Sequence, residues 1–173
     1  AVQAGAVETS GDGGGGGVGG RIERRDGRAG AVEGRGVVVG PGDDAALGRP
    51  PAGHELVVSR DAAVEGVHVR GQTQSAQTAG RRAAVAALSD LAAMGARPLG
   101  MTFALAAPPQ LDLRRFDGFV GGICREAATH ACPLLGGNVT AARQTAATLT
   151  VLGSAPRGRA LERRARVGDR VFV

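Results

Sequence analysis

The fold is decided by residues 83–94, which read AAVAALSDLAAM. Only Ser89 and Asp90 are polar in this run, and a helix that is apolar on nearly all sides is normally a buried one. Gly95 tolerates the left-handed conformation found at helix ends, and Pro98 cannot continue a helix. The stretch therefore predicts a buried helix that stops at Gly95 and carries one carboxylate, Asp90.

Apolar runs on both sides of this helix predict further elements. Residues 56–58 read as a strand that leads into Ser59-Arg60-Asp61, and residues 64–69 are expected to continue it beyond a bulge. The apolar positions of residues 113–127 recur at helical spacing and predict an amphipathic helix, although glycines weaken its middle. The other expected strands are residues 37–39, 101–107, 134–135, 148–152 and 171–173. Strands and helices interleave, so the fold class is α/β (α+β).

The composition bounds the class of protein. The chain has 173 residues, of which 43% are hydrophobic, and this is enough for one domain with a core. Residues 1–20 are glycine-rich and are expected to be a disordered leader, which leaves residues 21–173 as the folded domain. The net charge is +5, but no basic stripe is interleaved with aromatic residues, so nucleic acid is not an expected partner.

Other classes are excluded by what the sequence lacks. No apolar run approaches the roughly 20 residues of a membrane span, so no membrane partner is expected. The two cysteines, Cys124 and Cys132, are too few for a disulfide scaffold or a cysteine zinc site. We therefore expect a cytoplasmic protein with reduced thiols.

Four carboxylates fall where chemistry is expected. Asp43 and Asp44 follow the first strand in a glycine turn, Asp61 follows the second strand, and Asp90 lies in the predicted buried helix. Each also has a structural explanation: turn chemistry for the first two, a solvated strand end for Asp61, and an arginine partner or an exposed position for Asp90. Carboxylates that converge from a turn, a strand end and a helix would suit Mg²⁺, which prefers oxygen ligands and shares them with phosphates and water.

Five motifs, in this order, resemble those of thiamine-monophosphate kinases. They are GDDAA at residues 42–46, SRDAAVEGVH at 59–68, SDLAAMGA at 89–96, LGGNVT at 135–140 and a closing stretch over 159–169. The resemblance covers residues 37–173 and favours this family over its relatives in the aminoimidazole ribonucleotide synthetase-like superfamily. It implies the N-terminal domain of that fold, with a mixed β-sheet packed with helices, and a homodimer in which the sheets of two subunits form a barrel.

The resemblance also implies an activity and a set of site residues. Such enzymes transfer the γ-phosphate of ATP to thiamine monophosphate, giving thiamine diphosphate, and they use Mg²⁺. By position, the metal ligands fall at Asp43, Ser59, Arg60, Asp61, Asp90 and Asn138. The ATP contacts fall at Gly137, Asn138 and Arg163, and a substrate contact falls at His68.

Two positions depart from the family pattern. Arg60 stands where the family has a small hydroxyl residue, and Asn138 replaces an acidic metal ligand, which removes one negative charge. Family members are also longer, and their C-terminal domain, missing from this chain, completes the active site. The chain alone is therefore expected to have little or no kinase activity. An alternative stays open: a non-catalytic nucleotide-binding or dimerisation module of the same superfamily.

Overall fold

The computed structural model describes residues 36–39 and 45–170. The expected leader (residues 1–20), the pair Asp43 and Asp44, and the strand expected at residues 171–173 lie outside the described residues. Within the described residues, no helix is both long and apolar enough to cross a membrane.

The main body is one four-stranded sheet with two helices on one of its faces. The elements in chain order are β1 (Val37–Val39), β2 (Leu47–Gly48), β3 (His54–Val64), α2 (Ala76–Ala93), β4 (Arg97–Ala107), α3 (Leu113–Thr129), β5 (Leu134–Ala141) and β6 (Ala146–Pro156). The sheet order is β3-β6-β4-β5, and only the β4/β5 pair is parallel. Since parallel neighbours need a crossover connection, α3 serves as the link between β4 and β5. β1 and β2 form a separate antiparallel pair.

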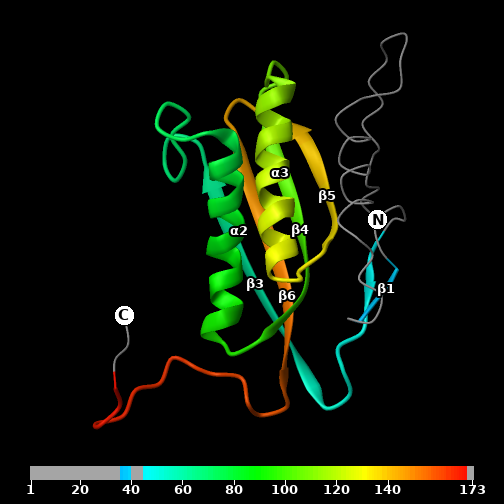
Figure 1. Ribbon diagram of the computed structural model, residues 1–173, viewed down its shortest axis with the longest axis vertical. Helices are drawn as coiled ribbons and strands as arrows, with labels where there is room; N and C mark the ends of the chain where they lie inside the picture. Colours follow the sequence, from blue (N-terminus) through cyan, green and yellow to red (C-terminus); the bar gives the residue numbers. More distant parts are fainter. Residues whose placement is uncertain (1–35, 40–44, 171–173) are drawn as a thin grey trace.

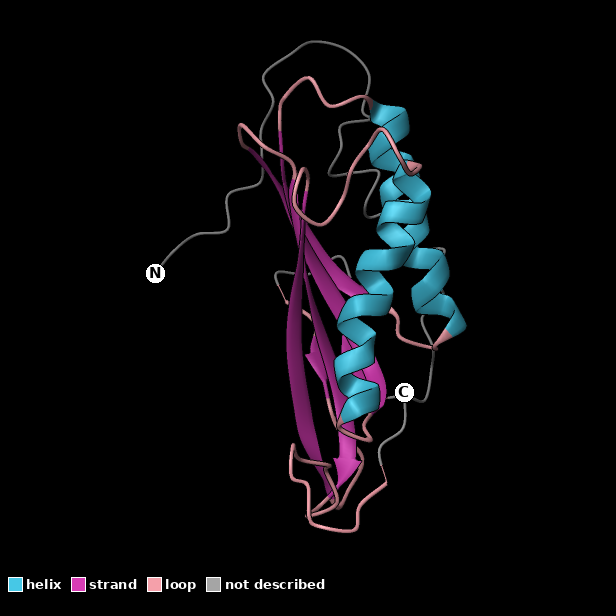
Figure 2. Cartoon of the chain, turned by 90° about the vertical axis from the view of Figure 1, so that its left-hand side faces the viewer, coloured by secondary structure: helices cyan, strands magenta, loops and turns pink. Residues whose placement is uncertain are grey.

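The two layers explain where the core lies. Figure 1 shows α2 and α3 side by side over the sheet, and Figure 2 shows that both helices lie on the same side of it. The core between the layers is built mainly from alanine, leucine and valine, with Phe103 and Phe116 as its largest members. The expected mixed α/β class is confirmed. The sheet is open in the described part of this single chain, so the expected barrel is not seen here.

Helix α2 ends where the sequence predicts and begins earlier. Its end is fixed by Gly95, which has φ +66°, and by the bond from the Ala96 backbone N–H to the Leu91 carbonyl at 2.8 Å. The expected start at Ala83 is wrong, because the helix begins after Ser75, whose hydroxyl accepts a bond from the Thr78 N–H at 3.1 Å. This capping serine extends the helix by two turns that the apolar pattern did not reveal.

The prediction that α2 is buried on nearly all sides is also wrong. Ala83, Ala87 and Leu91 face the core, whereas Ser89 and Asp90 are exposed. Alanine explains the difference, because its small side chain loses little free energy at either kind of position. An alanine-rich helix therefore looks buried in sequence although one of its sides faces solvent.

Glycines set the distance between the two helices. A Cβ atom on Gly80 would lie 2.0 Å from the Phe119 carbonyl oxygen, and one on Gly122 would lie 2.1 Å from the Gln77 carbonyl oxygen. The backbones of α2 and α3 therefore approach each other too closely for any other residue. The glycines that weakened the sequence prediction of α3 are thus partly explained by its packing against α2.

β1 has the expected bounds, whereas β3, β4, β5 and β6 are longer than the apolar runs suggested. β4 already includes Pro98, β5 continues through Gly137, and β6 runs from Ala146 to Pro156. The expected continuation of β3 over residues 64–69 is wrong. Residues 65–69 turn back instead, with Gly66 at φ +84° and the Val69 N–H bonded to the Val64 carbonyl at 3.2 Å.

Candidate functional site

The side chains of Ser59, Asp61 and Asp90 line the space between β3 and α2. Successive residues of a strand point to opposite faces, so Ser59 and Asp61 share the face that the helices cover. The Ser59 hydroxyl donates to Asp90 Oδ2 at 2.5 Å, which joins the two elements directly. The structure therefore brings together Ser59 and Asp90, and it places Asp61 on the same side of β3.

Asp90 is exposed rather than buried, which corrects the expectation drawn from its apolar neighbours. It therefore needs no arginine to offset the cost of burial, and its described partner is the Ser59 hydroxyl. Asp61 is half-buried, and its Oδ1 accepts a bond from the Ala62 N–H at 2.7 Å. Both carboxylates thus keep oxygen atoms that could serve a cation.

A groove of about 490 Å³ continues from Asp61 along the β3–α2 boundary. We call it the β3–α2 groove. Its polar lining includes His68, from the turn after β3, and Arg81 and Arg82, from the first half of α2. The groove therefore has a carboxylate beside two guanidinium groups and an imidazole, a charge arrangement that suits a metal-bound phosphate.

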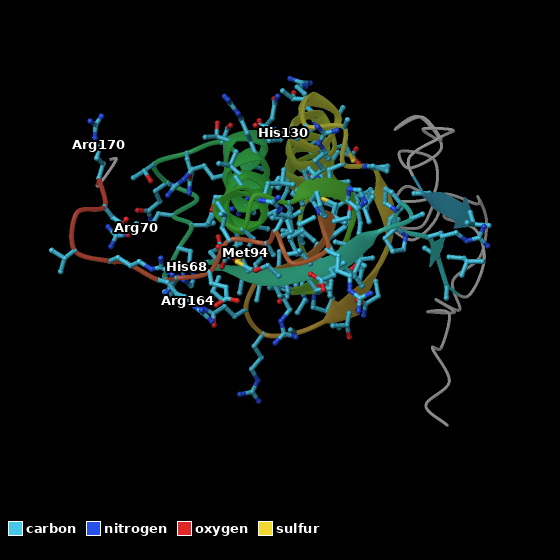
Figure 3. All side chains as sticks on the ribbon, turned by 90° about the horizontal axis from the view of Figure 1, so that it is seen from below. His68, Arg70, Met94, His130, Arg164 and Arg170 are labelled. Atoms are coloured by element: carbon cyan, nitrogen blue, oxygen red, sulfur yellow. The ribbon has the colours of Figure 1, made fainter. Side chains whose placement is uncertain are left out.

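His68 is held in one orientation by the turn that carries it. Its Nδ1 accepts a bond from the Val64 N–H at 3.2 Å. In the neutral imidazole the proton then resides on Nε2, which is free to donate. Figure 3 shows His68 on the β3 side of the molecule, whereas His130 lies by α3. The structure thus places His68 on the same groove as Asp61.

Sequence reasoning missed Arg82, which lines the groove together with Asp61 and His68. Its Nη1 donates to Gln74 Oε1 at 2.9 Å, and this bond fixes the direction of the guanidinium. The signal was available, because Arg82, Ala86 and Asp90 follow at spacings of four residues and so share one side of a helix. It was hidden by the expectation that the helix starts at Ala83.

Arg81 is anchored differently, to a buried carboxylate of α3. Its Nε donates to Glu126 Oε2 at 2.7 Å, and His130 Nε2 lies 3.2 Å from Glu126 Oε1. Burial by itself raises the pKa of Glu126, but the hydrogen bonds and charges of Arg81 and His130 outweigh it, so the pKa lies below its ordinary value of 4.5. Glu126 therefore stays ionised and holds α2 and α3 together beside the groove.

Arg60 does not join this group. It is exposed and stands between Ser59 and Asp61, so its side chain leaves β3 on the open face of the sheet. The guanidinium therefore adds no positive charge beside the two carboxylates. The strand alternation could have shown this from the sequence, because Ser59 and Asp61 are two residues apart.

Asn138 also lies on the open face. The register aligns Ala62 with Thr148, Thr148 with Ala104, and Ala104 with Asn138, so the four residues form one row across the sheet. Three interstrand spacings separate Asn138 from β3, which amounts to roughly 14 Å. Within one chain, the structure does not bring Asn138 to the side of Ser59, Asp61 and Asp90.

Gly137 lies at the row of Asp61, but on the far strand. A Cβ atom there would lie 2.2 Å from the Phe103 carbonyl oxygen, so the glycine is needed for the close approach of β5 to β4. This packing explains the residue without a ligand. Its predicted contact with ATP stays a prediction.

The segment after β6 carries Arg163 past the end of α2. The Leu161 N–H bonds to the Met94 carbonyl at 2.9 Å, and the Leu161 side chain packs against Gly95. Met94 in turn bonds through its N–H to the Asp90 carbonyl at 3.1 Å. The chain therefore passes within about one helical turn of Asp90 just before it reaches the exposed Arg163.

The donor set of this site fits Mg²⁺ in its chemistry, although it is incomplete. Ser59, Asp61 and Asp90 offer hydroxyl and carboxylate oxygens, which are the ligand atoms that Mg²⁺ takes. No cluster of three or more histidine, cysteine or acidic side chains with the geometry of a metal site occurs among residues 36–39 and 45–170. Since Asp43 lies outside these ranges, its predicted role is not tested.

Comparison with known proteins identifies the family of the chain. Residues 42–155 match the family described as "AIR synthase related protein, N-terminal domain". The match spans more than half of the chain, and the chain therefore belongs to this family. The resemblance read from the five motifs is confirmed at this level.

Its similar proteins include thiamine-monophosphate kinases. The enzyme of Synechococcus elongatus is 44% identical over 133 residues, which are 76% of this chain and 41% of the relative. The crystal structure of the enzyme from Stenotrophomonas maltophilia K279a is 38% identical with a TM-score of 0.72, and the match covers 87% of this chain and 45% of that one. The structure of AaThiL complexed with AMPPCP and TMP shares the fold, with 24% identity and a TM-score of 0.59 over 66% of this chain and 37% of that one. The chain thus spans less than half the length of these relatives.

Proposed function

We propose that the chain supplies the N-terminal half of a thiamine-phosphate kinase, which transfers the γ-phosphate of ATP to thiamine monophosphate. Two observations carry the proposal: Ser59 is hydrogen-bonded to Asp90 between β3 and α2, and Asp61, on the same face of β3 as Ser59, lines a groove with His68 and Arg82. Phosphoryl transfer requires the neutralisation and positioning of phosphates more than covalent help from side chains. Carboxylates for a metal and cationic groups for phosphate are the parts that such a reaction needs.

The roles of the residues follow from their placement. Asp61 and Asp90 would hold Mg²⁺, and Ser59 would either complete the ligand set or orient Asp90 through its hydrogen bond. When bound, Mg²⁺ would offset the negative charge of the transferring phosphoryl group. His68 Nε2–H and the Arg82 guanidinium would bind the phosphate of thiamine monophosphate. Asp43 and Asn138 remain proposed additional ligands.

The reaction itself is a direct displacement. A phosphate oxygen of thiamine monophosphate attacks the γ-phosphorus of ATP, and the bond between that phosphorus and the β–γ bridging oxygen breaks. The products are ADP and thiamine diphosphate. The proposed ATP contacts are Arg163, Gly137 and Asn138, and the planar guanidinium of Arg163 offers a fork of donors that suits a phosphate.

The open face of the sheet supports the proposed homodimer. Leu56 and Val58, next to Arg60 on β3, are 51% and 56% exposed. These apolar side chains face away from the helices, and within the described residues they stay exposed. We propose that a second copy packs its own sheet there in the cytoplasm. Because the chain spans less than half of its relatives, we also propose that a C-terminal domain outside these residues completes the active site.

The alternative of a non-catalytic module rested on Arg60 and Asn138. Both side chains lie on the open face, so these two departures leave Ser59, Asp61 and Asp90 unchanged as proposed metal ligands. This placement favours the kinase half over the alternative.

The proposal is tested by calorimetric titration of a non-hydrolysable ATP analogue into the chain, with and without Mg²⁺. We expect binding that requires Mg²⁺ and that is lost in Asp61→Asn and Asp90→Asn. Asp112→Asn is the matched control, because Asp112 caps α3 outside the groove and asparagine caps helices about as well. Binding that does not depend on Mg²⁺, or that is retained in both Asp61→Asn and Asp90→Asn, would contradict the proposal. We expect no turnover of thiamine monophosphate by the chain alone.

A further inference from the structure

Arg82 is an arginine of the β3–α2 groove whose direction is set by a neutral partner. Its Nη1 donates to Gln74 Oε1 at 2.9 Å. Three other arginines of the described residues pair with carboxylates instead: Arg81 with Glu126, Arg115 with Glu65 and Arg164 with Glu162. An amide oxygen orients a guanidinium without cancelling its charge, whereas a carboxylate does both. Gln74 therefore leaves the positive charge of Arg82 for a ligand of the groove.

The start of α2 brings these two side chains together. Gln74 immediately precedes Ser75, which caps the helix and accepts a bond from the Thr78 N–H at 3.1 Å, so the backbone next to Gln74 is held in place. Arg82 lies about two turns further on, and the side chains of a helix lean toward its N-terminus. The long side chain of Arg82 therefore reaches back along α2 to the Gln74 amide.

The surroundings of Gln74 favour this bond. Gln74 is half-buried and lines a second hollow, of about 320 Å³, between the helices and the sheet. The walls of this hollow include Leu105, Phe116 and Phe119, whose side chains offer no hydrogen bonds. Water competes less for a half-buried amide than for an exposed one, so the bond to Arg82 is stronger there than it would be at the surface. Gln74 thus holds the guanidinium at the edge of the groove.

We infer that Gln74 is a positioning residue for phosphate binding, which aims the Arg82 guanidinium into the β3–α2 groove and leaves its charge uncompensated. The inference rests on the proposed function, because it takes from that function a phosphate group as the ligand of the groove. One nitrogen of the guanidinium bonds to Gln74, and its remaining N–H groups can bind phosphate oxygens. A guanidinium that is already oriented loses less conformational entropy when the phosphate binds.

Gln74→Glu separates this role from a purely structural one. The new carboxylate would still accept the bond from Arg82, and a negative charge near the start of a helix is favourable, so stability against urea should stay the same or rise. Phosphate binding should nevertheless weaken about tenfold, because the carboxylate offsets the charge of the guanidinium and repels the phosphate. A residue that only ties the start of α2 to Arg82 would not produce these opposite effects.

Two further variants complete the comparison. Gln77→Glu is the matched control, because it places the same charge in the first turn of α2, at an exposed residue that lines neither hollow. Its phosphate affinity should stay within about twofold of wild type, since solvent and salt screen an exposed charge. Gln74→Met keeps a side chain of similar length and removes the acceptor without adding charge. It should weaken phosphate binding about threefold, because the guanidinium must then be ordered by the ligand itself.

The probes are inorganic phosphate, followed through the Nε–H NMR signal of Arg82, and thiamine monophosphate, titrated by calorimetry with Mg²⁺ present. We expect both Gln74 variants to bind either probe more weakly than wild type and Gln77→Glu to bind as wild type does. The inference is overturned if either Gln74 variant binds phosphate as tightly as wild type, or if Gln74→Glu lowers stability and affinity together. It is also overturned if Gln77→Glu weakens binding as much as Gln74→Glu, or if phosphate leaves the Arg82 signal of wild type unchanged. If wild type binds inorganic phosphate through Arg82 but does not bind thiamine monophosphate, the proposed function fails while the inference stands.

Discussion

The close approach of α2 and α3 makes Gly122→Ala a sharp test of the fold that positions Asp90. A Cβ atom at Gly122 would lie 2.1 Å from the Gln77 carbonyl oxygen and 2.9 Å from the Arg81 backbone nitrogen. Both are backbone atoms, so no side chain can rotate away and the helices must separate. Overpacking of this kind costs up to about 3 kcal/mol, while the better helix propensity of alanine returns about 1 kcal/mol. We therefore expect a net loss of about 2 kcal/mol.

Urea unfolding followed by circular dichroism measures this loss, since the midpoint shifts in proportion to stability. Gly118→Ala is the matched control on the same helix, because its Cβ atom would lie 3.3 Å from the Ala76 Cβ atom, a contact that a small adjustment relieves. The propensity gain should then roughly cancel the cost, leaving a change within about 0.5 kcal/mol. If Gly122→Ala is as stable as Gly118→Ala, the helices are not packed as described.

Three further predictions concern the site and the core. Ser59→Ala should weaken Mg²⁺ binding in the presence of nucleotide by about tenfold, because Asp90 loses the hydroxyl that orients it. Calorimetry measures this affinity, and an unchanged value would contradict the role of Ser59. The lowered pKa of Glu126 makes its ionised form stabilising above its ordinary pKa of 4.5, and this stability is lost as the pH falls through the lowered value. Glu126→Gln should therefore cost most stability near neutral pH and progressively less in acid, as measured by urea unfolding at several pH values; a cost independent of pH would refute it. Burial raises the pKa of Cys132 to about 12, so an alkylating reagent should modify this thiol only after the chain unfolds. Mass spectrometry can map the modified cysteines, and rapid labelling of Cys132 in the folded chain would contradict its burial.

Local features of the sequence contain enough information to place the parts of the site that lie within one element. The glycine stop of α2 follows from Gly95, and the pairing of a serine and an aspartate two residues apart on one side of β3 follows from strand alternation. The same alternation places Arg60 on the other face, but reading the motif as a linear string hid this. The neighbourhood of Ser59 and Asp90 could not be read from either segment, because it depends on how α2 packs on the sheet.

The position of Asn138 depends on the register between strands, which no local stretch of sequence reveals. Asn138 lies in a glycine motif and therefore looks like a site residue in the sequence. The face of the sheet to which it belongs is set by the pairing of β5 with β4, which includes an irregularity between Met101 and Thr102. Alanine obscured the exposure of α2, because it is compatible with both core and surface. The spacing of Arg82 and Asp90 places both on one side of α2, but the role proposed for Arg82 depends on the β3–α2 groove, which only the tertiary structure creates.

We propose that Ser59, Asp61 and Asp90 form a half-site for a metal-bound nucleotide. Substoichiometric Mn²⁺, a paramagnetic substitute for Mg²⁺, can locate this site through the broadening of amide NMR signals, with a non-hydrolysable ATP analogue present. The signals around Asp61 and Asp90 should broaden first, and Asp61→Asn should abolish the effect. Broadening centred on another part of the chain, or unaffected by that substitution, would contradict it.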